Sequence, residues 1–249
     1  MVNSPLASAT FFVSPVTLII EEFKVCSVMQ DKKNKRDIRS QIKHIMQSVV
    51  LMLPLIIFLH PMLAYSASKT VVVLGDSLSA EYGLPRGKGW VSLMQARLKE
   101  KNINTSVVNA SISGETTAGG KTRLPSLLRQ HHPGILIIEL GGNDGLRGLS
   151  LAATGVNLLE MIRQANSSGA QVLLVGMQIP PNYGPDYSKK FAAMYQGLSN
   201  EKNVRLVPFL LEGLDDTEKF FQSDRIHPNQ MAQMQMLDNV WNTLKHLIK

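Results

Sequence analysis

The sequence predicts an α/β protein with three layers, in which a parallel sheet of about five strands lies between two layers of helices. From residue 68 onward, short apolar runs alternate with longer amphipathic segments, the pattern of β-α-β units with right-handed crossovers. The run 134–141 (GILIIELG) is apolar and bounded by glycines, as expected for a strand covered on both faces. No repeat, linker or low-complexity tract interrupts residues 68–249, so we expect a single domain there.

The individual elements follow from the same patterns. Strands are predicted over 70–75, 105–110, 134–141, 171–178 and 204–209. Helices are predicted over 90–101, 122–131, 151–169, 187–202 and 228–248. Pro125 is expected in the first turn of its helix, where a missing N–H is tolerated. Gly169 closes the third helix, and Pro228 opens the last one.

Composition narrows the class of protein. The chain has 249 residues, of which 44% are hydrophobic and 18% charged, and a net charge of +7. Residues 1–66 hold seven Lys and Arg against four Asp and Glu, which leaves +4 scattered over the remainder without a basic stripe or interleaved aromatics. This distribution argues against nucleic-acid binding. Cys26 is the only cysteine, so residues 67–249 have neither a disulfide, a thiolate nucleophile nor a Cys-ligated zinc.

Residues 1–67 are predicted to be a leader. A basic stretch (31–44), an apolar run of about 11 residues (49–59) and small residues (64–68) follow one another, the order found in secretory signal peptides. The apolar run is shorter than the ~20 residues that span a bilayer, although an N-terminal membrane anchor is the alternative. Translation is expected to start at Met29 and cleavage to follow residue 66 or 67, near 66–68, which would leave 68–249 in the periplasm or outside the cell.

Polar segments follow the predicted strands. They are GDS (75–77), NASISGE (109–115), GGNDG (141–145) and, before the last helix, SDRIHPN (223–229). Ligands of parallel α/β sheets bind outside the carboxyl ends of the strands. These segments therefore mark the edge at which a site would assemble.

Ser77 is a candidate nucleophile at this edge. A serine hydroxyl needs a neighbouring imidazole to accept its proton, and Asp224 stands three residues before His227, so that one turn can present a carboxylate that orients the ring. The alternative for Asp224 is a helix cap ahead of Pro228. His131, His132 and His246 are expected at helix ends or on the surface.

Three groups could stabilise an oxyanion beside Ser77. They are the backbone N–H of Ser77, the N–H of Gly114, which carries no Cβ to block a substrate, and the side-chain amide of Asn143. The alternative for the glycines around Asn143 is a plain strand-to-helix turn. Asp76 and Asp144 are expected to support turns and caps rather than to act as second catalytic acids.

Other chemistries lack their motifs. The sequence has no G-x-S-x-G elbow, no Walker lysine motif, no G-x-G-x-x-G after the first strand and no H-E-x-x-H. We therefore expect neither a nucleotide cofactor nor a zinc-peptidase site.

The four segments together resemble the blocks of the GDSL, or SGNH, hydrolase family, in family order: GDSLS, SISGE, GGND and DRIHP. The resemblance covers residues 70–249 and is closest to the bacterial periplasmic acyl-CoA thioesterase I/protease I/lysophospholipase L1 group. It implies a flavodoxin-like fold, no metal or cofactor, a triad of Ser77, Asp224 and His227, and an oxyanion hole of Ser77, Gly114 and Asn143. The implied substrates are fatty-acyl esters and thioesters, including acyl-CoA and lysophospholipids.

Three residues are expected to act on substrate choice. Glu81 stands where this group usually has glycine, and a carboxylate one helical turn after Ser77 could disfavour anionic substrates. Ile179 and Pro180 belong to a stiff apolar loop (177–183) that could form an acyl-chain wall. A carbohydrate O-deacetylase with the same triad and a non-catalytic lipid- or glycan-binding module are the alternatives. We expect a monomer that acts on a small acyl ester, with no nucleic-acid partner and no membrane span after signal cleavage.

Overall fold

A computed structural model of the chain describes residues 37–38, 43 and 69–248. The chain divides into two units after Tyr65, and the second unit contains all of the strands reported below. The start at Met29, the signal peptide and the cleavage near 66–68 lie outside the described residues. They remain predictions.

Five parallel strands form the sheet, in the order β2-β1-β3-β4-β5. They are β1 (Lys69–Gly75), β2 (Thr105–Asn109), β3 (Ile135–Glu139), β4 (Gln171–Val175) and β5 (Val204–Val207). The chain winds from β1 outward to β2 and then returns to the other side of β1. The order therefore reverses between β1 and β3, and their carboxyl ends border the crevice where parallel α/β sheets bind ligands.

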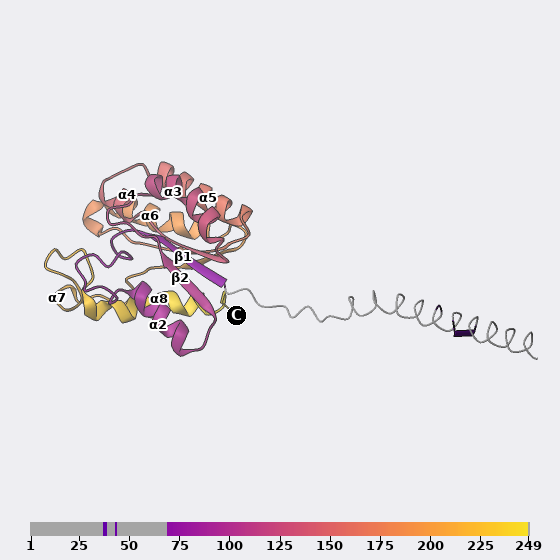
Figure 1. The fold of residues 1–249 in the computed structure, drawn as a ribbon. Helices are drawn as coiled ribbons and strands as arrows, with labels where there is room; N and C mark the ends of the chain where they lie inside the picture. Colours follow the sequence, from indigo (N-terminus) through magenta and orange to yellow (C-terminus); the bar gives the residue numbers. More distant parts are fainter. Residues whose placement is uncertain (1–36, 39–42, 44–68, 249) are drawn as a thin grey trace, which may run out of the picture. The chain divides into compact units, whose positions relative to one another are not determined.

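Helices cover both faces of the sheet, which confirms the predicted three layers (Figure 1). On one side lie α2 (Trp90–Glu100) and α8 (Gln233–Leu244), and on the other α3 (Thr117–His131), α5 (Leu151–Ser167) and α6 (Pro185–Leu198). All five residues of β3 are buried, which explains its apolar run. Within residues 37–38, 43 and 69–248, no helix has the length and apolar character needed to cross a membrane.

Helix α3 differs from its prediction. It begins at Thr117 rather than at residue 122, because the side chain of Thr116 accepts from the N–H of Gly119 and a carboxylate oxygen of Asp144 accepts from the N–H of Thr117. Pro125 consequently lies inside the helix, and its predicted place in the first turn is wrong. A Cβ on Gly120 would stand 2.3 Å from a methyl group of Leu140, so glycine allows α3 to approach the sheet closely.

Four short elements were not predicted: α4 (Gly142–Leu146), η1 (Pro181–Tyr183), α7 (Thr217–Phe220) and η2 (Gln230–Ala232). The last of these replaces the beginning of the helix predicted over 228–248. Asn229 accepts from the N–H of Met231 and so starts a 3-10 turn, and α8 begins only at Gln233. Pro228 therefore precedes the helical region and does not open α8.

Candidate active site

Ser77 lies in a tight turn directly after β1. Residues 77–83 form successive turns rather than a helix, so Glu81 does not stand one helical turn after Ser77. The N–H of Ala80 donates to the Asp76 carbonyl (2.9 Å), and one Asp76 carboxylate oxygen accepts from the N–H of Leu78 (3.0 Å). Asp76 thus supports the turn, as expected, and β1 ends one residue earlier, at Gly75.

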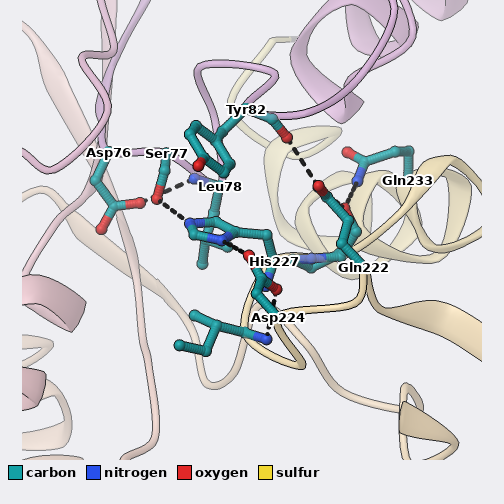
Figure 2. A network of polar contacts seen from close by, with 10 residues as sticks. Asp76, Ser77, Leu78, Tyr82, Gln222, Asp224, His227 and Gln233 are labelled. Atoms are coloured by element: carbon teal, nitrogen blue, oxygen red, sulfur yellow. Dashed lines mark hydrogen bonds and ion pairs between the residues drawn. The ribbon is translucent and has the colours of Figure 1, made fainter. Parts of the chain in front are cut away.

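His227 bridges Ser77 and Asp224 (Figure 2). Its Nε2 lies 3.0 Å from Ser77 Oγ and its Nδ1 lies 2.7 Å from Asp224 Oδ2. The other Asp224 oxygen accepts from the N–H groups of Ile226 and His227. An ionised Asp224 can only accept a hydrogen bond, so Nδ1 carries the proton and the Nε2 lone pair faces the serine hydroxyl.

The carboxyl of Asp224 is held in its ionised form. Partial burial works against this charge, but hydrogen bonds from the backbone N–H and imidazole of His227 and from the N–H of Ile226 outweigh it and lower the pKa of Asp224 to about 2. Asp224 therefore remains an acceptor for the ring throughout the neutral pH range.

Tyr82 also contacts the imidazole and was not singled out from the sequence. Its ring centroid lies 4.4 Å from that of His227, with an interplanar angle of 39°. Gln222 donates to the Tyr82 carbonyl at 2.9 Å, which ties the nucleophile turn to the loop that carries His227 (Figure 2). The ring contact restricts the imidazole on the face that the hydrogen bonds leave free.

The three groups expected to hold an oxyanion differ in whether they already donate a hydrogen bond within the protein. Within the described part of the chain, the N–H groups of Ser77 and Gly114 have no acceptor. Gly114 has a φ of 78°, a conformation that favours glycine. The Asn143 amide donates to Asp76 (2.9 Å) and to the Glu115 carbonyl (3.1 Å). An oxyanion would therefore replace one of these two acceptors of Asn143.

The family model described as the GDSL-like Lipase/Acylhydrolase family matches residues 73–233, a segment that includes all of the groups above. The chain belongs to this family. GDSL enzymes take their name from the segment that holds Ser77 here.

Curated relatives carry esterase and thioesterase names. The chain is 49% identical to the protein named Esterase TesA of Pseudomonas aeruginosa over 183 residues, which covers 74% of this chain and 91% of the relative. It is 42% identical to the Arylesterase of Vibrio mimicus, covering 80% and 100%. It is 40% identical to the Thioesterase 1/protease 1/lysophospholipase L1 of Escherichia coli K12, covering 74% and 86%.

Solved structures agree with the fold. A crystal structure of TesA matches with a TM-score of 0.70 at 49% identity, covering 72% of this chain and 99% of that one. The psychrotrophic esterase EstA from Pseudoalteromonas, inhibited by monoethylphosphonate in its structure, matches with a TM-score of 0.68 at 37% identity, covering 72% and 98%. The three-layer GDSL hydrolase fold is therefore shown for this chain.

A mainly apolar cavity of about 320 Å³ lies beside the loop that carries Asp224 and His227. Its lining includes Ile179 and Pro180, which the sequence had suggested. Met177 of the same loop and the side chains of Leu146, Phe209, Phe221 and Ile226 complete its apolar wall, and Gln178 and Arg225 add polar groups. Arg225 and Ile226, which stand between Asp224 and His227 in the sequence, line one side of the cavity. The cavity therefore lies next to the loop of His227 and offers room for an apolar group.

Glu81 departs from its expected position. It has a φ of 60°, a left-handed conformation that explains why glycine is usual in this group. Its carboxylate accepts from the N–H groups of Gly87 and Gly89 and from Ser92 Oγ. Desolvation opposes its charge, but these hydrogen bonds lower the pKa of Glu81. The side chain fixes the loop before α2 while it remains negatively charged.

Sequence reasoning missed Glu139, which was included in an apolar run. It is fully buried at the end of β3, and its Oε2 accepts from Ser79 Oγ (2.7 Å) and from the N–H of Asp76 (3.2 Å). The one available signal was a single acidic residue within ILIIEL (135–140).

Asp144 stabilises the start of α3, near the carboxyl ends of the strands. It is buried and accepts from the N–H and hydroxyl of Thr117, so it caps α3 as expected. In the part of the chain that the structure describes, no three His, Cys, Asp or Glu side chains are grouped so that they could hold a metal ion.

Proposed function

We propose that this GDSL hydrolase cleaves fatty-acyl esters and thioesters through an acyl-enzyme formed on Ser77. The observation that carries the proposal is the position of His227, which lies within hydrogen-bond distance of both Ser77 Oγ and Asp224. This arrangement of hydroxyl, imidazole and carboxylate is the one that acyl transfer by serine requires.

In the first half-reaction, Ser77 Oγ attacks the carbonyl carbon while His227 Nε2 takes the hydroxyl proton. The negative charge that develops on the carbonyl oxygen is stabilised by the N–H groups of Ser77 and Gly114 and by the Asn143 amide. The imidazolium, stabilised by Asp224, then gives its proton to the departing alcohol or thiol, and an acyl ester remains on Ser77.

In the second half-reaction, water attacks this ester. His227 accepts a proton from the water, and the resulting hydroxyl adds to the acyl carbon. Collapse of the second tetrahedral species returns the proton to Ser77 Oγ and releases the carboxylic acid.

The apolar cavity supports a substrate with an alkyl chain rather than an acetyl group. Burying one methylene contributes about 0.8 kcal/mol, so we expect kcat/KM for p-nitrophenyl esters to rise about fourfold per methylene from acetate upward, until the chain fills the cavity. Leu146→Trp is expected to shorten this series because Leu146 lines the cavity.

Leu149→Trp is the matched control. Leu149 is comparably exposed, at 44% against 38% for Leu146, and does not line the cavity, so the series should remain unchanged. Hydrolysis restricted to acetyl esters would favour the deacetylase alternative. A protein that binds these esters without cleaving any of them would favour the binding module.

Glu81 is proposed to reduce activity on anionic substrates. Its carboxyl group is ionised, and solvent screens the negative charge. We therefore expect Glu81→Gln to raise kcat/KM for acyl-CoA about two- to threefold at low ionic strength. The gain should decrease with added salt, and p-nitrophenyl butyrate should show no gain. Equal changes for both substrates would contradict the electrostatic role. Glu81→Gly adds a comparison in which the loop contacts are lost as well.

We propose that the enzyme is exported, with cleavage after residue 66 or 67. The support is the succession of basic (31–44), apolar (49–59) and small (64–68) segments. N-terminal sequencing of the exported protein locates the cleavage point, and a mature protein that begins at Met1 would contradict the proposal. We further propose that the mature enzyme is a monomer.

A further inference from the structure

Glu139 is a buried carboxyl that the proposed triad does not use. It is 0% exposed, and it stands opposite Gly75 in the register of β3 with β1. Its side chain reaches across to the nucleophile turn, where one oxygen, Oε2, accepts from two donors. These are the N–H of Asp76 and the hydroxyl of Ser79. The two donors lie on either side of Ser77 in the sequence.

The carboxyl packs directly against the turn. A Cβ on Gly75 would stand 2.7 Å from Oε2 and 2.7 Å from Ser79 Oγ. Glycine at position 75 therefore leaves the space in which the Glu139 carboxyl fits between strand and turn. A larger residue there would displace either the carboxyl or the turn.

The surroundings of Glu139 favour its neutral form. Within the described residues, no donor reaches its second oxygen, Oε1, and none of the ion pairs involves Glu139. A buried carboxylate without a cation is strongly disfavoured. Burial, followed by the charge of Asp76, accordingly holds the pKa of Glu139 well above its usual range.

The same contact extends to the oxyanion groups. The N–H of Asp76 is fixed by Glu139, and the Asp76 side chain accepts from Leu78 and from the Asn143 amide. Displacing the Asp76 backbone would therefore move the nucleophile and the amide together. Neither Ser77 nor Asn143 contacts Glu139 directly through a hydrogen bond in the described structure.

We propose that Glu139 is a positioning residue whose neutral carboxyl holds residues 76–79 so that Ser77 Oγ stays in line with His227. This inference rests on the proposed role of Ser77 as nucleophile. A leucine could fill the same space, but it would leave the Asp76 N–H and the Ser79 hydroxyl buried without an acceptor.

The test compares Glu139→Gln with Glu139→Leu. Glutamine keeps an acceptor oxygen at neutral charge, and leucine removes it. The readouts are kcat and KM for p-nitrophenyl butyrate and the rate of reaction with a p-nitrophenyl alkylphosphonate. In that reaction Ser77 Oγ bonds to phosphorus, p-nitrophenolate leaves, and the serine proton passes to His227. The phosphonate reaction measures the reactivity of Ser77 Oγ alone, because it does not require a complete catalytic cycle.

We expect Glu139→Gln to react with the phosphonate within about threefold of the wild-type rate. We expect Glu139→Leu to be slower by about 10²-fold, since displacement of reacting atoms by about 1 Å has effects of that size. Its kcat should fall in parallel while its KM changes little. Ile137→Ala is the matched control: it weakens the buried core of β3 without touching the turn, so it should lower Tm and leave the phosphonate rate unchanged.

A folded Glu139→Leu protein with the wild-type phosphonate rate would overturn the positioning role. A Glu139→Gln protein as slow as Glu139→Leu would overturn the neutral-acceptor role. If the leucine variant fails to fold, Ser79→Ala provides the test, because it deletes the hydrogen bond from the Ser79 hydroxyl to Glu139. A phosphonate rate about tenfold below that of the wild type supports the proposal. An unchanged phosphonate rate overturns it. If Ser77→Ala remained fully active, the proposed function itself would fail, whatever the Glu139 variants did.

Discussion

Replacing Ser77 with alanine is expected to lower kcat for p-nitrophenyl butyrate by about 10⁵-fold or more. The variant lacks the hydroxyl oxygen to which the proposed mechanism attaches the acyl group, so the two-step route is closed. The oxyanion groups and the binding cavity remain, and they sustain a residual rate about 10³- to 10⁴-fold above that in water. Steady-state kinetics with each ester of the chain-length series measures the loss.

Ser106→Ala is the matched control for this substitution. Ser106 is exposed on β2 and its hydroxyl contacts Thr70, away from the carboxyl edge of the sheet, so its removal should leave kcat unchanged. If the Ser77→Ala protein were as active as the wild type, Ser77 would not be the nucleophile.

Replacing Asp224 with asparagine is expected to lower kcat by about 10³- to 10⁴-fold. Asparagine can donate its amide hydrogen to His227 Nδ1, which moves the ring proton to Nε2 and removes the lone pair that accepts from Ser77. Because the pKa of Asp224 is about 2, the wild-type carboxylate accepts from Nδ1 at every pH above about 3. The loss in the asparagine variant should therefore persist across neutral and alkaline pH.

The Asp224→Ala variant distinguishes the effect of the His227 tautomer from the effect of the Asp224 charge. The Asp224 side chain is 38% exposed, so water can take the place of the missing carboxylate and accept from Nδ1. We expect the alanine variant to be less impaired than the asparagine variant, by about tenfold. The reverse order would mean that the electrostatic effect of the carboxylate outweighs its control of the tautomer.

The layers of the fold could be predicted because they depend on local patterns. Continuous apolar runs identified β1, β3 and β4, and helical periodicity identified α2 and α5. The beginning of α3 could not be predicted, since residues 117–121 include two glycines of low helix propensity. Thr116 supplies a local cap, but the second cap comes from Asp144, 27 residues after Thr117, and no local pattern indicates that contact.

The site could be predicted to the extent that strand ends share one edge of a parallel sheet. That rule placed Ser77, Gly114 and Asn143 together, and the spacing of Asp224 and His227 supplied their pairing. Glu139 and Tyr82 were missed because their roles depend on contacts across 60 residues or more.

Glu81 illustrates a further limit of local patterns. Its position on a helix was inferred from sequence distance alone, whereas its actual partners follow from a left-handed turn. The Glu81 carboxylate accepts hydrogen bonds from the loop before α2, and no local pattern indicates that this loop lies beside it.

The most direct test of the proposed mechanism is to trap the acyl-enzyme. The purified enzyme is mixed with p-nitrophenyl decanoate, quenched in acid within milliseconds, and examined by intact mass and peptide mass spectrometry. The mechanism predicts a mass increase of one decanoyl group, with the loss of one hydrogen, on the peptide that contains Ser77. An adduct on a different residue, or hydrolysis in which Ser77→Ala turns over as fast as the wild type and no adduct forms, would contradict it.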